Sequence, residues 1–220
     1  MYVTETLKRA YERMTGRGKP TVRQARAAVA RRRPKTFMFR DDGTIPNNPD
    51  VPVLLYPQVV DLERADDPAA VFEELFAAND WGDSWRNGIY DYVHYHSAIH
   101  EALGIARGRV RVRLGGDKGE EVDLAAGDVV VLPAGTGHQN LMASEDLLVV
   151  GAYPPSGEYD LCRGSKADHE KALAAIPLVP PPNFDPVYGK SGPLTKHWRD
   201  ALASKKSPRR NTATHGKLSA

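Results

Sequence analysis

The sequence contains a single cysteine, Cys162, among its 220 residues, so an internal disulfide is excluded. One free thiol fits a reducing compartment, and we expect a cytoplasmic protein in which Cys162 has a structural role. No apolar run approaches the roughly 20 residues needed to cross a membrane. The first residues also lack the apolar centre of a signal peptide. The composition therefore indicates a chain that neither spans a membrane nor depends on disulfides.

The chain has little net charge, because its 30 Lys and Arg nearly balance its 28 Asp and Glu for a formal net charge of +2, but the charge is strongly segregated along the chain. Residues 1–35 carry +9, residues 196–220 carry +6, and the acidic middle carries −13. Basic ends can bind nucleic acid, but neither a nucleic-acid motif nor an aromatic platform accompanies them. We therefore expect no nucleic-acid partner, and basic extensions that are solvated or lie on the acidic middle.

Three segments are predicted from these shifts in composition. Residues 1–35 form a basic extension with helices over Thr4–Thr15 and Thr21–Arg33, which glycine and proline terminate. Residues 36–200 form the folded domain, and residues 201–220 form a basic tail. We expect disorder over Ser204–Ala220, because this stretch has no hydrophobic period.

The middle of the chain contains two spaced groups of glycine, histidine and carboxylate residues. The first group has the spacing G-x5-H-x-H-x4-E-x6-G and the second G-x5-P-x-G-x2-H. Their members are Gly88, His94, His96, Glu101 and Gly108, followed by Gly127, Pro133, Gly135 and His138. Three imidazoles and one carboxylate form an N3O ligand set that suits a divalent first-row transition metal.

Strand parity indicates how these side chains can converge. Residues two apart on a strand face the same side, so His94 and His96 can reach one ion together. The same parity places Tyr90 and Tyr92 beside them, as possible proton donors. Arg86 shares this parity if the strand extends back to it, and could then bind a substrate carboxylate. Glu101 is an odd number of residues from His96, so we expect the strand to break between them.

The flanking sequence is dominated by predicted strands. Arginines alternate with apolar residues over 107–114, which indicates a half-buried strand with a solvated or subunit-contacting outer face. Further strands are expected at 121–124, 129–132 and 145–153. Asp67-Pro68 is a good helix start, and a second helix is predicted over 166–176. The prolines between Pro177 and Pro193 predict an extended arm.

The two groups together resemble the motifs of the cupin superfamily. The second group departs at its end, where Met142 replaces the family's asparagine and Asn140 stands two positions early. Segments such as Trp85-Arg86-Asn87-Gly88 and His94-Tyr95-His96-Ser97 are similar to the bacterial YjlB-like cupins. The resemblance implies an all-β jelly-roll barrel with peripheral helices and a helical N-terminal extension. It further implies a metal inside the barrel, but it names no substrate.

Three functions remain open at this point. The first is a mononuclear metal enzyme acting on a small organic molecule, either a dioxygenase with iron or an isomerase or lyase with Mn, Ni or Zn. The second is a non-catalytic barrel that binds or senses a small ligand, and the third is a storage or structural barrel. We favour the enzyme, with one divalent ion per barrel, and we expect a homodimer.

Overall fold

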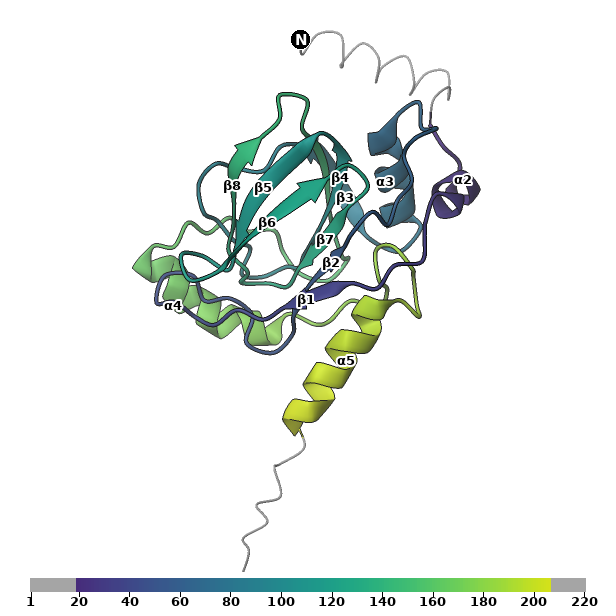
Figure 1. Ribbon diagram of the computed structural model, residues 1–220. Helices are drawn as coiled ribbons and strands as arrows, with labels where there is room; N and C mark the ends of the chain where they lie inside the picture. Colours follow the sequence, from purple (N-terminus) through teal and green to yellow (C-terminus); the bar gives the residue numbers. More distant parts are fainter. Residues whose placement is uncertain (1–18, 207–220) are drawn as a thin grey trace, which may run out of the picture.

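The computed structural model describes residues 19–206 (Figure 1). Its strands are β1 (Lys35–Phe37), β2 (Val53–Tyr56), β3 (Gly82–Asn87), β4 (Glu101–Arg107), β5 (Arg109–Leu114), β6 (Glu120–Ala125), β7 (Val129–Leu132), β8 (His138–Ala143) and β9 (Leu148–Tyr153). Its helices are α2 (Val22–Ala27), α3 (Pro68–Ala77), α4 (Lys166–Ala175), the 3₁₀ helix η1 (Ile176–Leu178) and α5 (Pro193–Lys206). The helix predicted over Thr4–Thr15 lies outside the described residues.

Two antiparallel sheets face each other and enclose the barrel. The larger sheet has the order β1-β2-β7-β4-β9-β3 and the smaller one the order β6-β5-β8. Strands that neighbour each other in these sheets are mostly distant in sequence, as in β2 with β7 and β4 with β9. Figure 1 shows the two sheets around a common interior, with α2 and α3 on one side of the barrel. The prediction of an all-β jelly-roll fold with peripheral helices is confirmed.

Strand parity divides the hydrophobic core into two parts. On β4, Leu103 and Ile105 point between the two sheets, where they pack against residues of β5 such as Val112. Ala102 and Ala106 point to the opposite face of the larger sheet, into the cluster formed with the helices. Because both faces of the larger sheet are covered, β2, β4 and β7 are buried almost throughout. Glu101 has the parity of Leu103, so it points into the barrel.

Helix α3 covers the outer face of the larger sheet. It begins as predicted, because the Asp67 side chain accepts hydrogen bonds from the amides of Ala69 and Ala70 and Pro68 opens the first turn. Phe72 packs over Gly104 of β4, where a Cβ atom would lie 2.5 Å from the ring. The close approach of helix and sheet therefore depends on the absence of a side chain at Gly104. The second helix predicted in the domain, over 166–176, is present as α4.

Helix α5 was not predicted, and it corrects the boundary at residue 200 and the expected tail. It ends at Lys206, so disorder from Ser204 onward is wrong as far as Lys206, and the remaining residues lie outside the described range. Trp198 is 1% exposed and donates its indole N–H to the carbonyl of Pro52 at 2.9 Å.

No helix in the described part of the chain is long and apolar enough to cross a bilayer.

Helix α2 is shorter than the predicted helix over Thr21–Arg33. It starts at the expected cap, Thr21, but ends at Ala27, because Val29 leaves the helix and forms a bridge with Val60. The next amide, of Ala30, continues this contact by donating to the carbonyl of Val59 at 2.8 Å. Helix α2 therefore contacts α3, and the segment after it contacts residues 59–61, so this part of the extension lies on the acidic middle of the chain, one of the two expected arrangements.

The proline-rich arm between η1 and α5 contains no named strand in the described structure, as its sequence predicted. One buried carboxylate holds this arm in place. Asp185 accepts hydrogen bonds from the hydroxyl of Tyr56 at 2.6 Å, the amide of Val187 at 2.8 Å and the amide of Leu194 at 2.9 Å. Asp185 therefore joins the arm, the start of α5 and strand β2 at a single point.

Candidate metal centre and its cavity

His94 and His96 lie on an irregular segment between β3 and β4, and the strand predicted for them is absent. Two isolated bridges lie in this segment, His94 with His138 and Tyr95 with Cys162. The backbones of His94 and His138 exchange two hydrogen bonds, of 3.1 and 2.9 Å. Tyr95 points into a separate apolar cluster, so the two histidines still face the same side. Their alternation survives without a strand because the bridges keep the backbone extended.

The two remaining residues of the predicted ligand set begin regular strands. Glu101 is the first residue of β4 and His138 is the first residue of β8. Residues 88–100 belong to no strand, so the break expected between His96 and Glu101 is replaced by a longer irregular segment that ends at Glu101. The larger sheet therefore contributes the carboxylate, and the smaller sheet contributes one imidazole.

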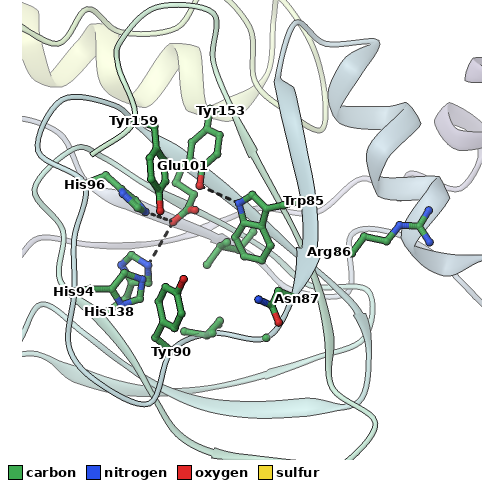
Figure 2. A pocket seen from close by; sticks show the side chains of 13 residues that line it. Trp85, Arg86, Asn87, Tyr90, His94, His96, Glu101, His138, Tyr153 and Tyr159 are labelled. Carbon is green, nitrogen blue, oxygen red and sulfur yellow. Dashed lines mark hydrogen bonds and ion pairs between the residues drawn. The ribbon is translucent and has the colours of Figure 1, made fainter. Parts of the chain in front are cut away.

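The four side chains converge inside the barrel (Figure 2). Ring nitrogens of His94, His96 and His138 lie within 4.8 Å of one another. Glu101 Oε2 lies 3.5 Å from Nε2 of His96 and 3.4 Å from Nε2 of His138. Adjacent ligands on an ion with bonds of about 2.1 Å are about 3.0 Å apart in an octahedral site and about 3.4 Å apart in a tetrahedral one. The separations of Glu101 from His96 and His138 are close to the tetrahedral value, and the three histidines form a group that could hold a metal ion.

The second nitrogen of each imidazole contacts a backbone carbonyl. His94 Nδ1 lies 3.2 Å from the carbonyl of Tyr92, and His138 Nδ1 lies 3.1 Å from that of Thr136. His96 Nδ1 contacts the carbonyl of Asp160. A carbonyl only accepts, so each Nδ1 carries the proton in these contacts and each neutral ring keeps a lone pair on Nε2. The backbone thereby orients all three Nε2 atoms as acceptors or metal ligands.

Burial and mutual contact set the protonation of the cluster. Burial and the neighbouring His138 lower the pKa of His94 to about 3, so this ring is neutral at physiological pH. Burial alone would raise the pKa of the Glu101 carboxyl, but His138 and His96 hold it below its usual range. For His96, burial opposes protonation, whereas Glu101 raises its pKa. An ionised carboxylate beside a neutral imidazole is the state that metal binding requires.

The carboxylate of Glu101 is the least satisfied group of the cluster. Glu101 is 2% exposed, and its Oε2 has no hydrogen bond from any described residue. Burying a carboxylate oxygen without a donor is costly, and a cation placed among the four side chains would remove this cost. The residues present therefore fit a divalent metal ion.

A cavity of about 310 Å³ opens next to these donors. Its wall is largely aromatic, with Trp85, Tyr90, Tyr153 and Tyr159, and Asn87 adds an amide (Figure 2). Tyr159 is 58% exposed, whereas Tyr153 is buried. Burial and the negative charge of Glu101 raise the pKa of the Tyr153 phenol, which is thus a neutral donor at physiological pH.

The structure corrects the role predicted for Arg86. Figure 2 shows its side chain pointing away from the cavity, toward α3. Its guanidinium pairs with Asp67 at 2.8 Å and Glu73 at 2.6 Å, and only 7% of the side chain is exposed. Strand β3 ends at Asn87, so parity counted back from His94 does not reach Arg86. Arg86 is fully engaged in a structural ion pair and does not face a substrate.

The two predicted tyrosines differ in position. Tyr90 lines the cavity, as expected, but Tyr92 is not among the lining residues. The two rings stack with centroids 4.8 Å apart, and the guanidinium carbon of Arg163 lies 3.7 Å from the Tyr92 centroid. The sequence reasoning placed both on one strand face, and the absence of that strand explains the error for Tyr92.

Sequence reasoning did not assign Trp85, Tyr153 and Tyr159 to the cavity. A signal existed for Tyr153, because it shares parity with Val149, which points between the sheets. No periodicity could have indicated Tyr159, which follows β9 in an irregular segment. The contact of His96 with the carbonyl of Asp160 was equally inaccessible, because it joins two irregular segments.

His100 and Cys162 are both buried near the cluster. His100 Nδ1 accepts a hydrogen bond from the amide of Ala134 at 2.9 Å, and its ring packs on Trp198, on the helix side of the sheet. Cys162 donates to the carboxylate of Asp160 at 3.3 Å, and burial raises the pKa of its thiol to about 11. A thiol that keeps its proton agrees with the structural role expected for Cys162.

A jelly-roll barrel with three inward-facing histidines that could hold a metal ion defines a cupin. The family model described as "Cupin domain" matches residues 87–150, which contain both predicted motifs. The uncharacterized protein YjlB of Bacillus subtilis (strain 168) is 37% identical over 167 residues, which cover 76% of this chain and 98% of that protein. The chain belongs to the cupin superfamily, among the YjlB-like bacterial cupins.

Solved structures show weaker similarity. The TDP-quinovose 3,4-ketoisomerase WlaRB of Campylobacter jejuni is 14% identical with a TM-score of 0.34, and the match covers 40% of this chain and 73% of that one. An 11S globulin of Wrightia tinctoria is 15% identical with a TM-score of 0.29, over 36% of this chain. The chain spans only 21% of that globulin.

Proposed function

We propose that this chain is a mononuclear metal-dependent enzyme that acts on a small organic molecule. One divalent transition metal ion would be held by His94, His96, Glu101 and His138. The observation that carries the proposal is the buried Oε2 of Glu101, which has no hydrogen-bond donor among the described residues but lies 3.4 and 3.5 Å from two imidazole nitrogens. Glutamate and oriented imidazoles suit Fe, Mn, Ni or Zn.

The cavity supports a catalytic role because it meets the ligand cluster directly. When bound, the ion would supply positive charge at a carbonyl, enol or carboxylate oxygen of the substrate, or a binding site for dioxygen. The protein supplies an aromatic wall that limits water and strengthens electrostatic contacts near the ion. The reaction is therefore of the dioxygenase or the isomerase and lyase type.

Charge in the cavity narrows the substrate further. Arg86 is the only lysine or arginine among the described lining residues, and its guanidinium is turned toward Asp67 and Glu73. No cationic side chain is thus left to bind a second anionic group inside the cavity. We infer a substrate with one anionic or enolisable oxygen group at the ion and a small, largely uncharged body against the rings.

Metal analysis and a substrate screen test this proposal. Protein purified without an affinity tag should contain about one divalent ion per chain, and His96→Ala should lose it. His197→Ala is the matched control, because His197 is an exposed histidine of α5. Loaded protein is then screened for oxygen consumption and for conversion of small carbonyl and enol compounds. Tight binding of one compound without turnover would favour a sensor over an enzyme.

A further inference from the structure

The cavity contains a hydroxyl group that the metal cluster does not use. Trp85 donates its indole N–H to the hydroxyl oxygen of Tyr153 at 2.9 Å (Figure 2). Since an indole N–H can only donate, the phenol oxygen is the acceptor in this bond and its own proton must point elsewhere. Among the described residues no hydrogen bond of ordinary geometry accepts that proton, although the Glu101 carboxylate lies close enough to raise the pKa of the phenol. Tyr153 is only 7% exposed and lines the cavity.

The backbone fixes this pair of side chains. Trp85 on β3 is directly opposite Gly151 on β9, and its indole covers that glycine so closely that a Cβ atom there would lie 2.1 Å from the ring. Tyr153 follows Gly151 by two residues on the same face of β9. Its ring is also set edge-on to His96, with centroids 5.9 Å apart and an interplanar angle of 86°. The hydroxyl therefore has a defined position beside the ligand cluster.

We propose that Tyr153, oriented by Trp85, is a specificity-determining residue whose hydroxyl donates a hydrogen bond to an oxygen atom of the bound substrate. The inference rests on the proposed function, because it assumes that the substrate binds at the ion. It narrows the ligand class to small molecules with a carbonyl, enolate or hydroxamate oxygen next to the oxygen on the ion. A ligand without such an acceptor would leave the proton of the Tyr153 hydroxyl without this hydrogen bond, which is the source of the discrimination.

The test measures ligand binding on cobalt(II)-loaded protein with acetohydroxamate as the probe. Cobalt affinity is measured first, and acetohydroxamate is then titrated while the visible absorption of the cobalt site is recorded. In Tyr153→Phe, acetohydroxamate should bind about tenfold more weakly, the usual effect of one lost hydrogen bond, with cobalt affinity unchanged. In Trp85→Phe the hydroxyl remains but loses its orientation, so we expect a loss of about threefold. Tyr188→Phe is the control, because Tyr188 does not line the cavity and its hydroxyl donates to the carbonyl of Ala30 at 2.7 Å.

The possible outcomes separate this inference from the metal site itself. Equal acetohydroxamate affinity in the wild type and Tyr153→Phe would overturn the inference and leave the metal site standing. A Tyr153→Phe variant that loses cobalt affinity but no further acetohydroxamate affinity would also overturn it, because Tyr153 would then position Glu101. Failure of the wild type to bind cobalt would overturn the proposed function together with this inference. If Tyr153→Phe does not fold, the threefold loss in Trp85→Phe decides.

Discussion

The substitution Glu101→Gln tests the proposed centre most directly. Glutamine keeps the size of the side chain but removes its charge, at a position that is 2% exposed and 3.4–3.5 Å from two imidazole nitrogens. Inside the barrel a carboxylate attracts a divalent ion far more strongly than an amide does. We expect the affinity for the ion to fall about 100-fold, which corresponds to about 2.7 kcal/mol.

This loss can be measured as thermal stability, because an ion that binds only the folded chain stabilises it by RT ln(1 + [M]/Kd). At a metal concentration of about 1,000 times the wild-type Kd, the wild type gains about 4.1 kcal/mol. The same concentration is about 10 times the Kd of the variant, which then gains about 1.4 kcal/mol. Each kcal/mol shifts Tm by about 2–4 °C in a chain of this size. The metal-induced rise in Tm should thus fall from about 8–16 °C to about 3–6 °C.

Glu121→Gln is the matched control for this measurement. Glu121 lies on β6 and pairs at the surface with Arg113 at 3.2 Å, so its loss should leave the metal-induced rise in Tm unchanged. A rise in Glu101→Gln equal to that of the wild type would refute the assignment of the carboxylate as a metal ligand.

Two further predictions concern buried groups outside the ligand set. Arg86→Leu leaves the carboxylates of Asp67 and Glu73 unpaired. Urea unfolding should show that the free energy of unfolding falls by about 2–4 kcal/mol, with the metal content unchanged. Unchanged stability together with lost metal would contradict the structural role of Arg86. Burial lowers the pKa of His100 from 6.5 to about 4. Between these values the unfolded chain binds a proton that the folded chain does not. The free energy of unfolding is therefore highest above pH 6.5 and falls as the pH falls toward 4. Over that range the free energy of unfolding should fall by up to about 3 kcal/mol more in the wild type than in His100→Gln. Glutamine keeps an acceptor for the amide of Ala134. Parallel curves of stability against pH for the two proteins would show this reasoning to be wrong.

The sequence was sufficient to predict that four donors converge, because few residue types bind metals and their spacing follows strand geometry. Strands β4 and β8, which begin at Glu101 and His138, were not predicted, so these two residues were identified from the motif spacing alone. Strand β7 was predicted at its observed bounds. The segment that carries His94 and His96 was misread as a strand. Two isolated bridges produce the same alternation there, and a sequence pattern cannot distinguish them from a ladder.

The parts that were missed depend on contacts between distant segments. Helix α5 had a readable pattern, because its apolar residues recur at helical spacing: Leu194, Trp198, Ala201 and Leu202. The basic residues around them suggested a solvated tail. The ion pair of Arg86 joins β3 to α3 and has no local signature. Tyr153 and Trp85 meet only because β3 pairs with β9 in one particular register. Tertiary packing determines the position of α5, the ion pair of Arg86 and the contact of Trp85 with Tyr153.

The reciprocal backbone hydrogen bonds between His94 and His138 bear on how the barrel would respond to an ion. The chain between these residues contains β4, β5, β6 and β7. An ion bound to both imidazoles would therefore close a ring made of this stretch of chain and the two metal–nitrogen bonds. While the ion stays bound, this ring would oppose the local separation of the two segments that it joins. Removal of the ion by a chelator would then require the segment at His94 to separate from β8. Slow hydrogen exchange of the His94 and His138 amides would report the same opening event.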